Sequence, residues 1–156
     1  MGLDQYLYAS TFRASFDWRG EENKKQFAEV SEALNAGSLM DKVDFGTATI
    51  QFKVGQWRKA NHIHKWFVDN VQGGEDDCRE YSVSRESLQE LKSLCLKVMA
   101  DQSQAESLLP REQGFFFGSE EVDEWYFEDV KYTLELIYHL LTDQFEDYEF
   151  HYQSSW

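Results

Sequence analysis

The sequence predicts an α+β fold, in which a small, mostly antiparallel sheet packs with about four helices in a single globular domain over residues 1–156. The chain has 156 residues, which is the usual length of one domain. Apolar residues recur at every second position in some segments and at every third or fourth in others, so both strands and helices are expected. These segments follow one another without the regular strand–helix alternation of a parallel sheet, which favours α+β.

Three segments have the composition of strands, and a fourth strand is expected in an aromatic run. The first segment, 3–8, is short, apolar and aromatic. In the second, 48–54, apolar and polar residues alternate, and Gly55 is expected to end the strand. The third segment, 148–152, alternates in the same way. At 114–118 two glycines enclose three phenylalanines, which fits a short strand buried on both faces or the wall of a pocket or interface.

Four segments have apolar residues at helical spacing. The expected helices cover 22–36, 56–71, 84–100 and 123–143. Gly37 suits the C-terminal cap of the first helix, because glycine tolerates the left-handed conformation that ends many helices. Gly73 and Gly74 are expected to end the second helix. Ser84 suits the N-cap of the third, because its hydroxyl can accept a hydrogen bond from the first turn.

The negative charge of the chain lies in its second half. The chain has 29 Asp and Glu against 15 Lys and Arg, a formal net charge of −14. Residues 1–72 contain as many basic as acidic residues, so the whole excess lies in 73–156. This excess fits either a solvated face or a surface that binds a basic protein partner. Direct nucleic-acid binding is disfavoured, because phosphate contacts need clustered Lys and Arg.

The helix expected at 56–71 contains most of the candidate ligand-binding residues. His64 lies within its apolar face, and Trp66 lies among its polar residues. His64 fits either a core histidine or a general base at the edge of a pocket. Trp66 fits either a residue covered by a loop or an aromatic platform beside basic side chains. The candidate site for a small molecule or nucleotide consists of Arg58, Asn61, His64 and Trp66, with Phe115 and Phe117 as walls.

The helix expected at 123–143 has a second apolar side. A helix that is apolar on two sides is buried twice, either wholly within its domain or once against a partner. Aromatic anchors with an acidic rim suit a basic protein partner, and a second copy of the chain is the alternative. The candidate partner-binding residues are Trp125, Glu128, Asp129, Tyr132, Leu136 and His139.

No residue pattern indicates a metal, a cofactor or a catalytic nucleophile. His62 and His64 are two positions apart, so on a helix they point about 200° apart and cannot share one ion. Cys78 follows Asp76 and Asp77, whose charges disfavour the thiolate. We therefore expect no metal and no cofactor, and we favour a protein that is not an enzyme. The sequence lacks an apolar run long enough to span a membrane and a signal peptide, so a cytoplasmic location is expected.

Three strings resemble one protein family. They are the opening MGLD-x-YL, the segment WRKAN-x-IH-x-WFV at 57–68, and GFFFGS at 114–119. Together they resemble a family of small uncharacterised proteins carried by bacteriophages and some bacterial genomes. The resemblance spans most of the chain and implies a phage-type accessory protein. It implies no catalytic residue and no cofactor, because no activity is established for that family.

These observations lead to one main functional hypothesis and two alternatives. The main hypothesis is a binding protein that inhibits or sequesters a host or defence component through its acidic, aromatic C-terminal half. The first alternative is a small-molecule binding protein or small enzyme that uses the segment Arg58–Trp66. The second is a homo-oligomeric structural component.

Overall fold

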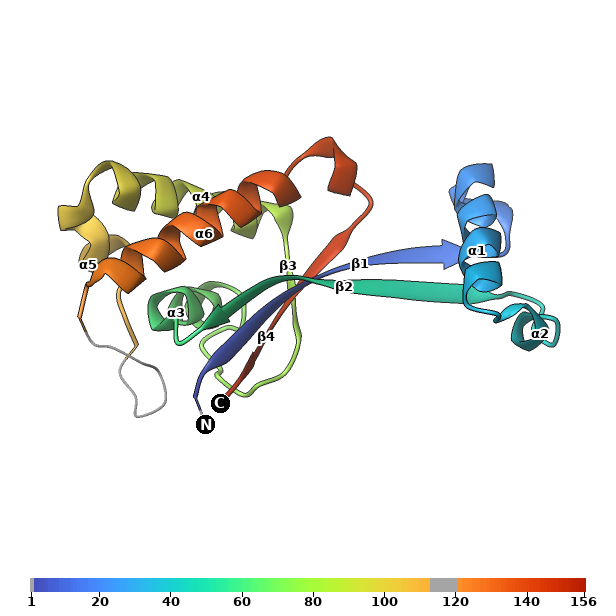
Figure 1. The fold of residues 1–156 in the computed structure, drawn as a ribbon, viewed down its shortest axis with the longest axis horizontal. Coiled ribbons are helices and arrows are strands. Elements are labelled where there is room, and N and C mark those ends of the chain that lie inside the picture. The colour runs from blue at the N-terminus through green and yellow to red at the C-terminus, as the bar shows by residue number, and fades with distance from the viewer. Residues whose placement is uncertain (1, 113–120) are drawn as a thin grey trace. The chain divides into compact units, whose positions relative to one another are not determined.

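The computed structural model describes residues 2–112 and 121–156 and has an α+β fold (Figure 1). Its sheet is antiparallel and four-stranded, in the order β2-β1-β4-β3. The strands are Asp4–Ala14 (β1), Thr47–Arg58 (β2), Tyr81–Val83 (β3) and Glu149–Ser155 (β4). The helices are Glu21–Ala33 (α1), Gly37–Met40 (α2), Asn61–Asn70 (α3), Arg85–Ala100 (α4), Ala105–Leu108 (α5) and Glu124–Leu140 (α6). The predicted fold class is confirmed, and the two shortest helices, α2 and α5, are additions to it.

The chain forms two compact units. Unit 1 consists of the residues up to Ala9 together with Lys53–Trp156, and unit 2 consists of Ser10–Phe52. Unit 2 therefore contains α1, α2 and the adjoining parts of β1 and β2. Unit 1 contains everything else that is described. The expectation of a single domain over the whole chain stays a prediction.

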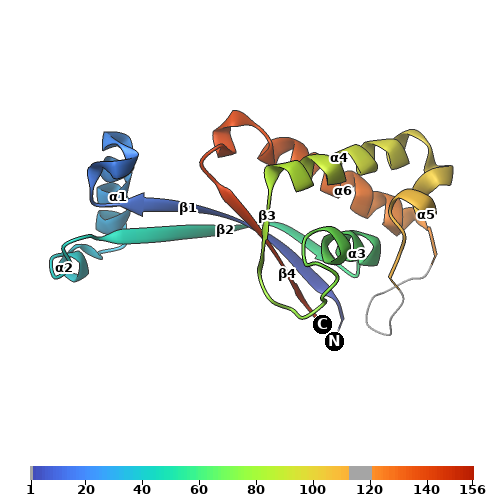
Figure 2. The ribbon, with the colours of Figure 1, turned by 180° about the vertical axis from the view of Figure 1, so that it is seen from behind.

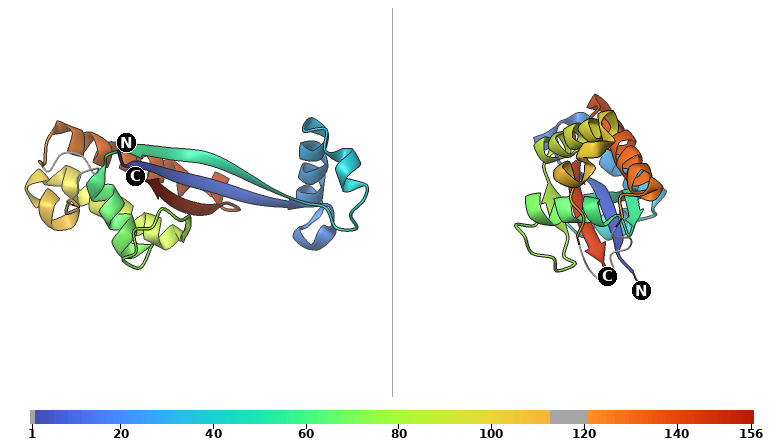
Figure 3. Two further views of the ribbon diagram at one scale, coloured as in Figure 1. Left: turned by 90° about the horizontal axis from the view of Figure 1, so that it is seen from below. Right: turned by 90° about the vertical axis from the view of Figure 1, so that its left-hand side faces the viewer.

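The core of unit 1 lies between its strands and three of its helices. In this unit α4 and α6 lie side by side (Figure 2), and the start of β1 lies next to the end of β4 (Figure 3). Phe67 of α3 stacks on Tyr152 of β4, with ring centroids 3.9 Å apart. The buried core residues include Leu7, Trp57, Ile63, Phe67, Leu88, Leu91, Val130, Ile137, Phe150 and Tyr152.

Gly55 does not end β2, so the predicted strand end and the predicted start of the next helix were both wrong. β2 continues to Arg58, and α3 begins only at Asn61. Gly55 is buried, and a Cβ atom there would lie 2.5 Å from Leu136 Cδ2. The glycine thus allows α6 to approach the strand closely. Trp57 faces the core from the strand, where its indole Nε1 donates a hydrogen bond to Thr133 Oγ1 at 2.8 Å.

The other predicted element boundaries agree in part with those of the structure. Ser84 caps α4 as predicted, because its side chain accepts a hydrogen bond from the backbone N–H of Ser87 at 3.0 Å. Gly37 does not cap α1 as predicted: α1 ends at Ala33, Asn35 takes the left-handed conformation with φ 54°, and Gly37 begins α2. β3, of three residues, was not predicted. The strand expected at 114–118 lies outside the described residues.

Candidate ligand pocket

A pocket of about 470 Å³ opens in unit 1 where the end of β2 meets the first turns of α3 and α6. This volume lies within the range of about 300–1,000 Å³ that is typical of small-molecule sites. The pocket is lined by Arg58, Lys59, Asn61, His62, Arg111, Glu121, Asp123, Trp125, Tyr126 and Asp129.

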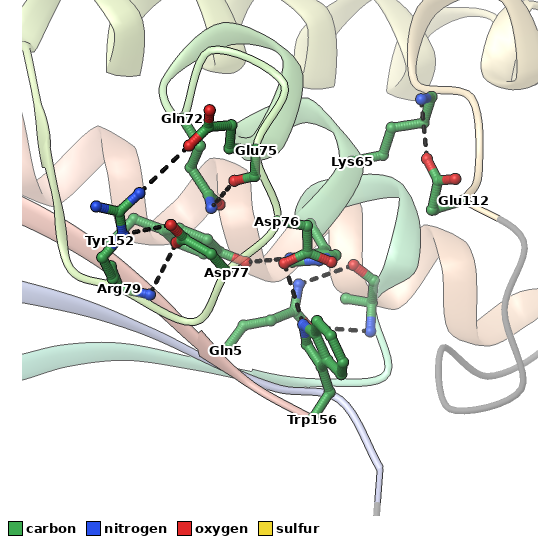
Figure 4. Close-up of polar contacts among 12 residues, drawn as sticks. Gln5, Lys65, Gln72, Glu75, Asp76, Asp77, Arg79, Glu112, Tyr152 and Trp156 are labelled. Carbon is green, nitrogen blue, oxygen red and sulfur yellow. Dashed lines mark hydrogen bonds and ion pairs between the residues drawn. The ribbon is translucent and has the colours of Figure 1, made fainter.

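Hydrogen bonds with residues at the start of the chain, Leu3 and Gln5, fix the turn between β2 and α3. Lys59 has the left-handed conformation, with φ 60°, and its N–H donates to the carbonyl of Leu3 at 2.8 Å. The side chain of Gln5 bonds both polar groups of Ala60: Nε2 donates to the carbonyl at 2.9 Å, and Oε1 accepts from the N–H at 3.2 Å. Figure 4 shows Gln5 in this position. These bonds hold the first turn of α3 against the pocket. The N-cap residue of α3 is Ala60, which has no side-chain acceptor for the helix N–H groups.

His62 forms the inner wall of the pocket. It is 2% exposed, and its ring stacks on Tyr126 with centroids 3.9 Å apart. Burial, together with the positive charge of Arg111, lowers the pKa of His62 to about 3, although Asp123 acts in the opposite direction. The imidazole is therefore neutral at physiological pH. Its Nε2 atom is buried and has no hydrogen-bond partner among the residues that the structure describes.

Arg111 is partly buried, and one of its guanidinium nitrogens also lacks a hydrogen-bond partner. Its Nε and Nη2 atoms contact the Glu106 carboxylate at 3.1 and 2.9 Å. Its Nη1 atom is buried without a hydrogen-bond partner in 2–112 and 121–156. A buried polar group that lacks a partner costs about 1–3 kcal/mol. Two buried nitrogens with unused hydrogen-bonding capacity thus border the same pocket.

The residues of α6 and its N-cap that line the pocket are acidic and aromatic: Asp123, Trp125, Tyr126 and Asp129. Asp123 caps this helix by accepting a hydrogen bond from the N–H of Tyr126 at 3.0 Å. Burial, together with the charges of Asp123 and Glu128, raises the pKa of Asp129 to about 7. Trp125 is 75% exposed at the rim. The lining of the pocket therefore combines basic side chains with acidic and aromatic ones.

The predicted ligand-binding residues do not form one site. Arg58 and Asn61 line the pocket. Trp66 borders a separate hollow of about 200 Å³, which it shares with Lys65 and Leu94. Phe115 and Phe117 lie outside the described residues.

His64 lies in a buried hydrogen-bond network and lines none of the hollows described above. Its side chain is 0% exposed. Nδ1 is 2.8 Å from the Tyr152 hydroxyl, and Nε2 is 3.0 Å from Asp76 Oδ2. Asp76 also accepts a hydrogen bond from Trp156 Nε1 at 3.0 Å. Figure 4 shows Asp76, Tyr152 and Trp156 in this network. These contacts give His64 a structural role that joins α3 to the C-terminal strand.

The predicted partner-binding residues also lie in different surroundings. Trp125 and Asp129 line the pocket, and Glu128 is exposed beside them. The Tyr132 hydroxyl accepts a hydrogen bond from the backbone N–H of Gln56 at 3.1 Å, and its ring packs against Trp57. Leu136 covers Gly55. His139 is exposed and borders a third hollow between α4 and α6. Part of the second apolar side of α6 is thus buried within unit 1.

Six of the ten lining residues were not predicted: Lys59, His62, Arg111, Glu121, Asp123 and Tyr126. On a helix that begins at Gln56, His62 would lie on the face opposite the apolar residues. Its burial depends on Tyr126 and Arg111, which lie 64 and 49 positions further along the chain. Only a contact between distant segments could have identified it.

The described residues supply little for metal or nucleophile chemistry. Nowhere in them do three or more His, Cys, Asp or Glu side chains gather so as to hold a metal ion. Cys78 and Cys95 are both free thiols. Burial raises the pKa of Cys95 to about 12, which disfavours its thiolate.

Among the described helices, none combines the length and apolar composition needed to cross a membrane. Comparisons with protein-family models, curated proteins and solved structures found no match to this chain.

Proposed function

We propose that this chain is a binding protein for a small molecule that carries an oxyanion group, and that the pocket between α3 and α6 is its site. The observation that carries the proposal is a pair of buried nitrogens, His62 Nε2 and Arg111 Nη1, neither of which has a hydrogen-bond partner in the described part of the chain. Arg111 Nη1 is a donor, and neutral His62 donates through Nε2 in the tautomer that carries the proton there. A phosphate or carboxylate oxygen in the pocket would accept from both. Binding would then supply hydrogen bonds that the described residues leave unmade.

The basic side chains of the pocket support the same ligand class. Arg58, Lys59 and Arg111 all belong to its lining. The first turn of α3 adds partial positive charge, because the N–H groups at a helix N-terminus attract anions. Arginine suits phosphate and carboxylate, since its planar group can donate two parallel hydrogen bonds.

The test uses ribose 5-phosphate and inorganic phosphate as probes, with isothermal titration calorimetry and thermal unfolding as readouts. We expect saturable binding of ribose 5-phosphate, and a stabilisation of about 2.7 kcal/mol when the probe is at 100 times its dissociation constant. Arg58→Gln should weaken binding about tenfold or more. Arg79→Gln is the matched control, because Arg79 is exposed and pairs with Asp77 away from the pocket. Equal binding by the two variants, or no binding of either probe at millimolar concentration, would refute the proposal.

A second candidate function is the binding of a basic protein, such as a host or defence component that a phage-type accessory protein would inhibit. The observation that favours it is the exposure of Trp125 on α6 between exposed Glu124 and Glu128. An exposed tryptophan with an acidic rim is typical of a protein-binding surface.

Affinity purification from the natural host at low and high salt, read by native mass spectrometry, tests this second function. We expect a basic protein that is lost at high salt and lost with Trp125→Ala. The double variant Glu29→Gln with Glu32→Gln, on exposed positions of α1, should retain it. A bare multimer in every condition would instead support the homo-oligomeric alternative, and a partner retained by Trp125→Ala would exclude this surface.

A further inference from the structure

We propose that the occupant of the pocket is a small zwitterion, an α-amino acid, whose carboxylate is the oxyanion and whose ammonium group is held by carboxyl groups of the same pocket. This inference rests on the proposed function and identifies the ligand class of the same site. It follows from a lining in which cationic and acidic side chains occur together. In an α-amino acid a single carbon atom separates the two charged groups, so they need donors and acceptors that lie close to one another.

A carboxylate lies beside the unpartnered nitrogen of His62. Asp123 accepts a hydrogen bond from the N–H of Tyr126 at 3.0 Å, and the ring of Tyr126 stacks on His62 with centroids 3.9 Å apart. Arg111 and Asp123 both act on the pKa of His62, in opposite directions. His62 therefore has one positive and one negative side chain near it. A ligand of one charge attracts only one of them, whereas a zwitterion can pair with both.

Asp129 is a second carboxyl group that suits an ammonium ion. It lies three residues after Tyr126 on α6, so the two side chains share a face of the helix, and both line the pocket. Burial and the like charges of Asp123 and Glu128 raise the pKa of Asp129, and no cation of the described residues counts among the causes of the shift. A ligand ammonium group brings the positive charge and the three N–H donors that this carboxyl group lacks.

The carboxylate of the ligand has the partners given by the proposed function. His62 Nε2 and Arg111 Nη1 are buried at the pocket wall and have no hydrogen-bond partner in the segments that the structure describes. Trp125 belongs to the same lining and is 75% exposed. Its ring offers an apolar face against which the side chain of an amino acid can pack.

The test is a calorimetric comparison, at pH 7, of L-phenylalanine with 3-phenylpropionate, which lacks only the amino group, and with phenethylamine, which lacks only the carboxylate. L-Alanine and propionate repeat the first comparison with a smaller side chain. We expect each amino acid to bind about tenfold or more tightly than its analogue without the amino group, because a site built to accept from a donor rejects analogues that lack it. Asp129→Asn should reduce this preference several-fold. Asp143→Asn, an exposed position outside the pocket, should keep it.

The proton balance of binding gives a second readout. Asp129 is about half protonated at pH 7, because its pKa is about 7. An ammonium group beside it favours the ionised form, so L-phenylalanine should release protons on binding, whereas 3-phenylpropionate should take them up. Titrations in two buffers of different ionisation enthalpy measure the sign, and both exchanges should fall toward zero in Asp129→Asn. The other charged groups of the pocket and of α6 near Asp129 are Arg58, Lys59, Arg111, Glu121, Asp123 and Glu128.

Each other outcome has a distinct meaning. Equal binding of the amino acids and their analogues without the amino group would overturn the zwitterion and leave the oxyanion site in place. Failure of both amino acids to bind, with ribose 5-phosphate bound, would have the same meaning. Phenethylamine bound as tightly as L-phenylalanine would overturn this inference and the proposed function together, since the carboxylate would then contribute nothing. Failure of all these compounds, ribose 5-phosphate included, would also overturn both.

Discussion

His62 and His64 lie two residues apart on α3 and have opposite surroundings. Both ring nitrogens of His64 have partners, the hydroxyl of Tyr152 and the carboxylate of Asp76. The Nε2 atom of His62 has no partner within the described ranges, 2–112 and 121–156. His64 therefore stabilises the fold, and His62 is the histidine placed to meet a ligand.

The His64 network predicts a specific loss of stability in Tyr152→Phe. The substitution removes the hydroxyl 2.8 Å from His64 Nδ1 in a fully buried site, so a polar nitrogen loses its partner. We expect unfolding to require about 1–3 kcal/mol less free energy, measured by urea denaturation. Tyr138→Phe is the control, because Tyr138 is 62% exposed, and it should change stability by less than about 0.5 kcal/mol. Similar losses in both variants would mean that the network adds nothing.

The raised pKa of Asp129 predicts that the stability of the protein depends on pH. Burial, with Asp123 and Glu128, raises its pKa to about 7, while the unfolded chain releases this proton near about pH 4. The stability that Asp129 contributes is therefore complete below about pH 4 and is lost as the pH rises to 7. Above pH 7 the native state holds an ionised, half-buried carboxylate, in a pocket whose lining also includes the cations Arg58, Lys59 and Arg111 and the carboxylate of Glu121.

Asp129→Asn should remove this loss. At pH 8 we expect the variant to be more stable than the natural chain by about 1–2 kcal/mol, a value reduced to allow for solvent screening of a partly exposed group. At pH 4 the two should differ little. Urea denaturation at both pH values measures this, and Asp143→Asn should show no such change with pH. A constant difference for Asp129→Asn would contradict the raised pKa.

At the residue scale, the sequence identified those site residues whose signal comes from neighbouring positions along the chain. It identified Arg58 and Asn61, because basic and polar residues crowd one short segment. It placed His64 in a candidate site because a histidine in an apolar stripe is unusual. The reason for that position, a hydrogen bond to Tyr152, lies 88 residues away and has no local signal.

At the element scale, helical periodicity and the serine cap were reliable, and glycine was ambiguous. Ser84 caps α4 as predicted, and α6 begins at Glu124, one residue after the predicted start, with Asp123 as its N-cap. Gly55 was interpreted as a strand end, because glycine weakens strands. Its actual role is to admit Leu136, and sequence alone cannot distinguish a break from a close approach of two elements.

The cap at Ser84 predicts unequal effects of one substitution at two sites of α4. Ser84→Ala removes the acceptor for the N–H of Ser87 and should lower the free energy of unfolding by about 1 kcal/mol. Ser93→Ala, in the exposed middle of the same helix, should be neutral or slightly stabilising, because alanine is the better helix former. Thermal unfolding measures both. Equal effects would show that the cap does not stabilise α4.

At the scale of the whole molecule, the two units differ in how much apolar surface they bury. Unit 1 contains nearly all of the core. Unit 2 is described in full, and its buried apolar side chains are those of Ala14 and Phe27. Its exposed apolar residues are Trp18, Leu34, Leu39, Val43, Phe45 and Phe52. The lower burial predicts that unit 2 opens more readily than unit 1.

Native-state hydrogen exchange measures that difference. Amides in α1 should exchange about tenfold or more rapidly than those in α4 and α6, because few buried contacts oppose the local opening of unit 2. Amides of α4 protected no better than those of α1 would show that the molecule opens as one cooperative unit.

The most direct measurement of the central claim, that the pocket between α3 and α6 binds an oxyanion, is a titration of the ¹⁵N-histidine-labelled protein with ribose 5-phosphate, followed by NMR of the imidazole nitrogens. We predict that Nε2 of His62 shifts saturably as it gains a hydrogen-bond partner. The nitrogens of His64, already bonded to Tyr152 and Asp76, and of exposed His139 should stay unchanged. A titration in which His62 stays unchanged, or shifts no more than His139, would contradict the claim.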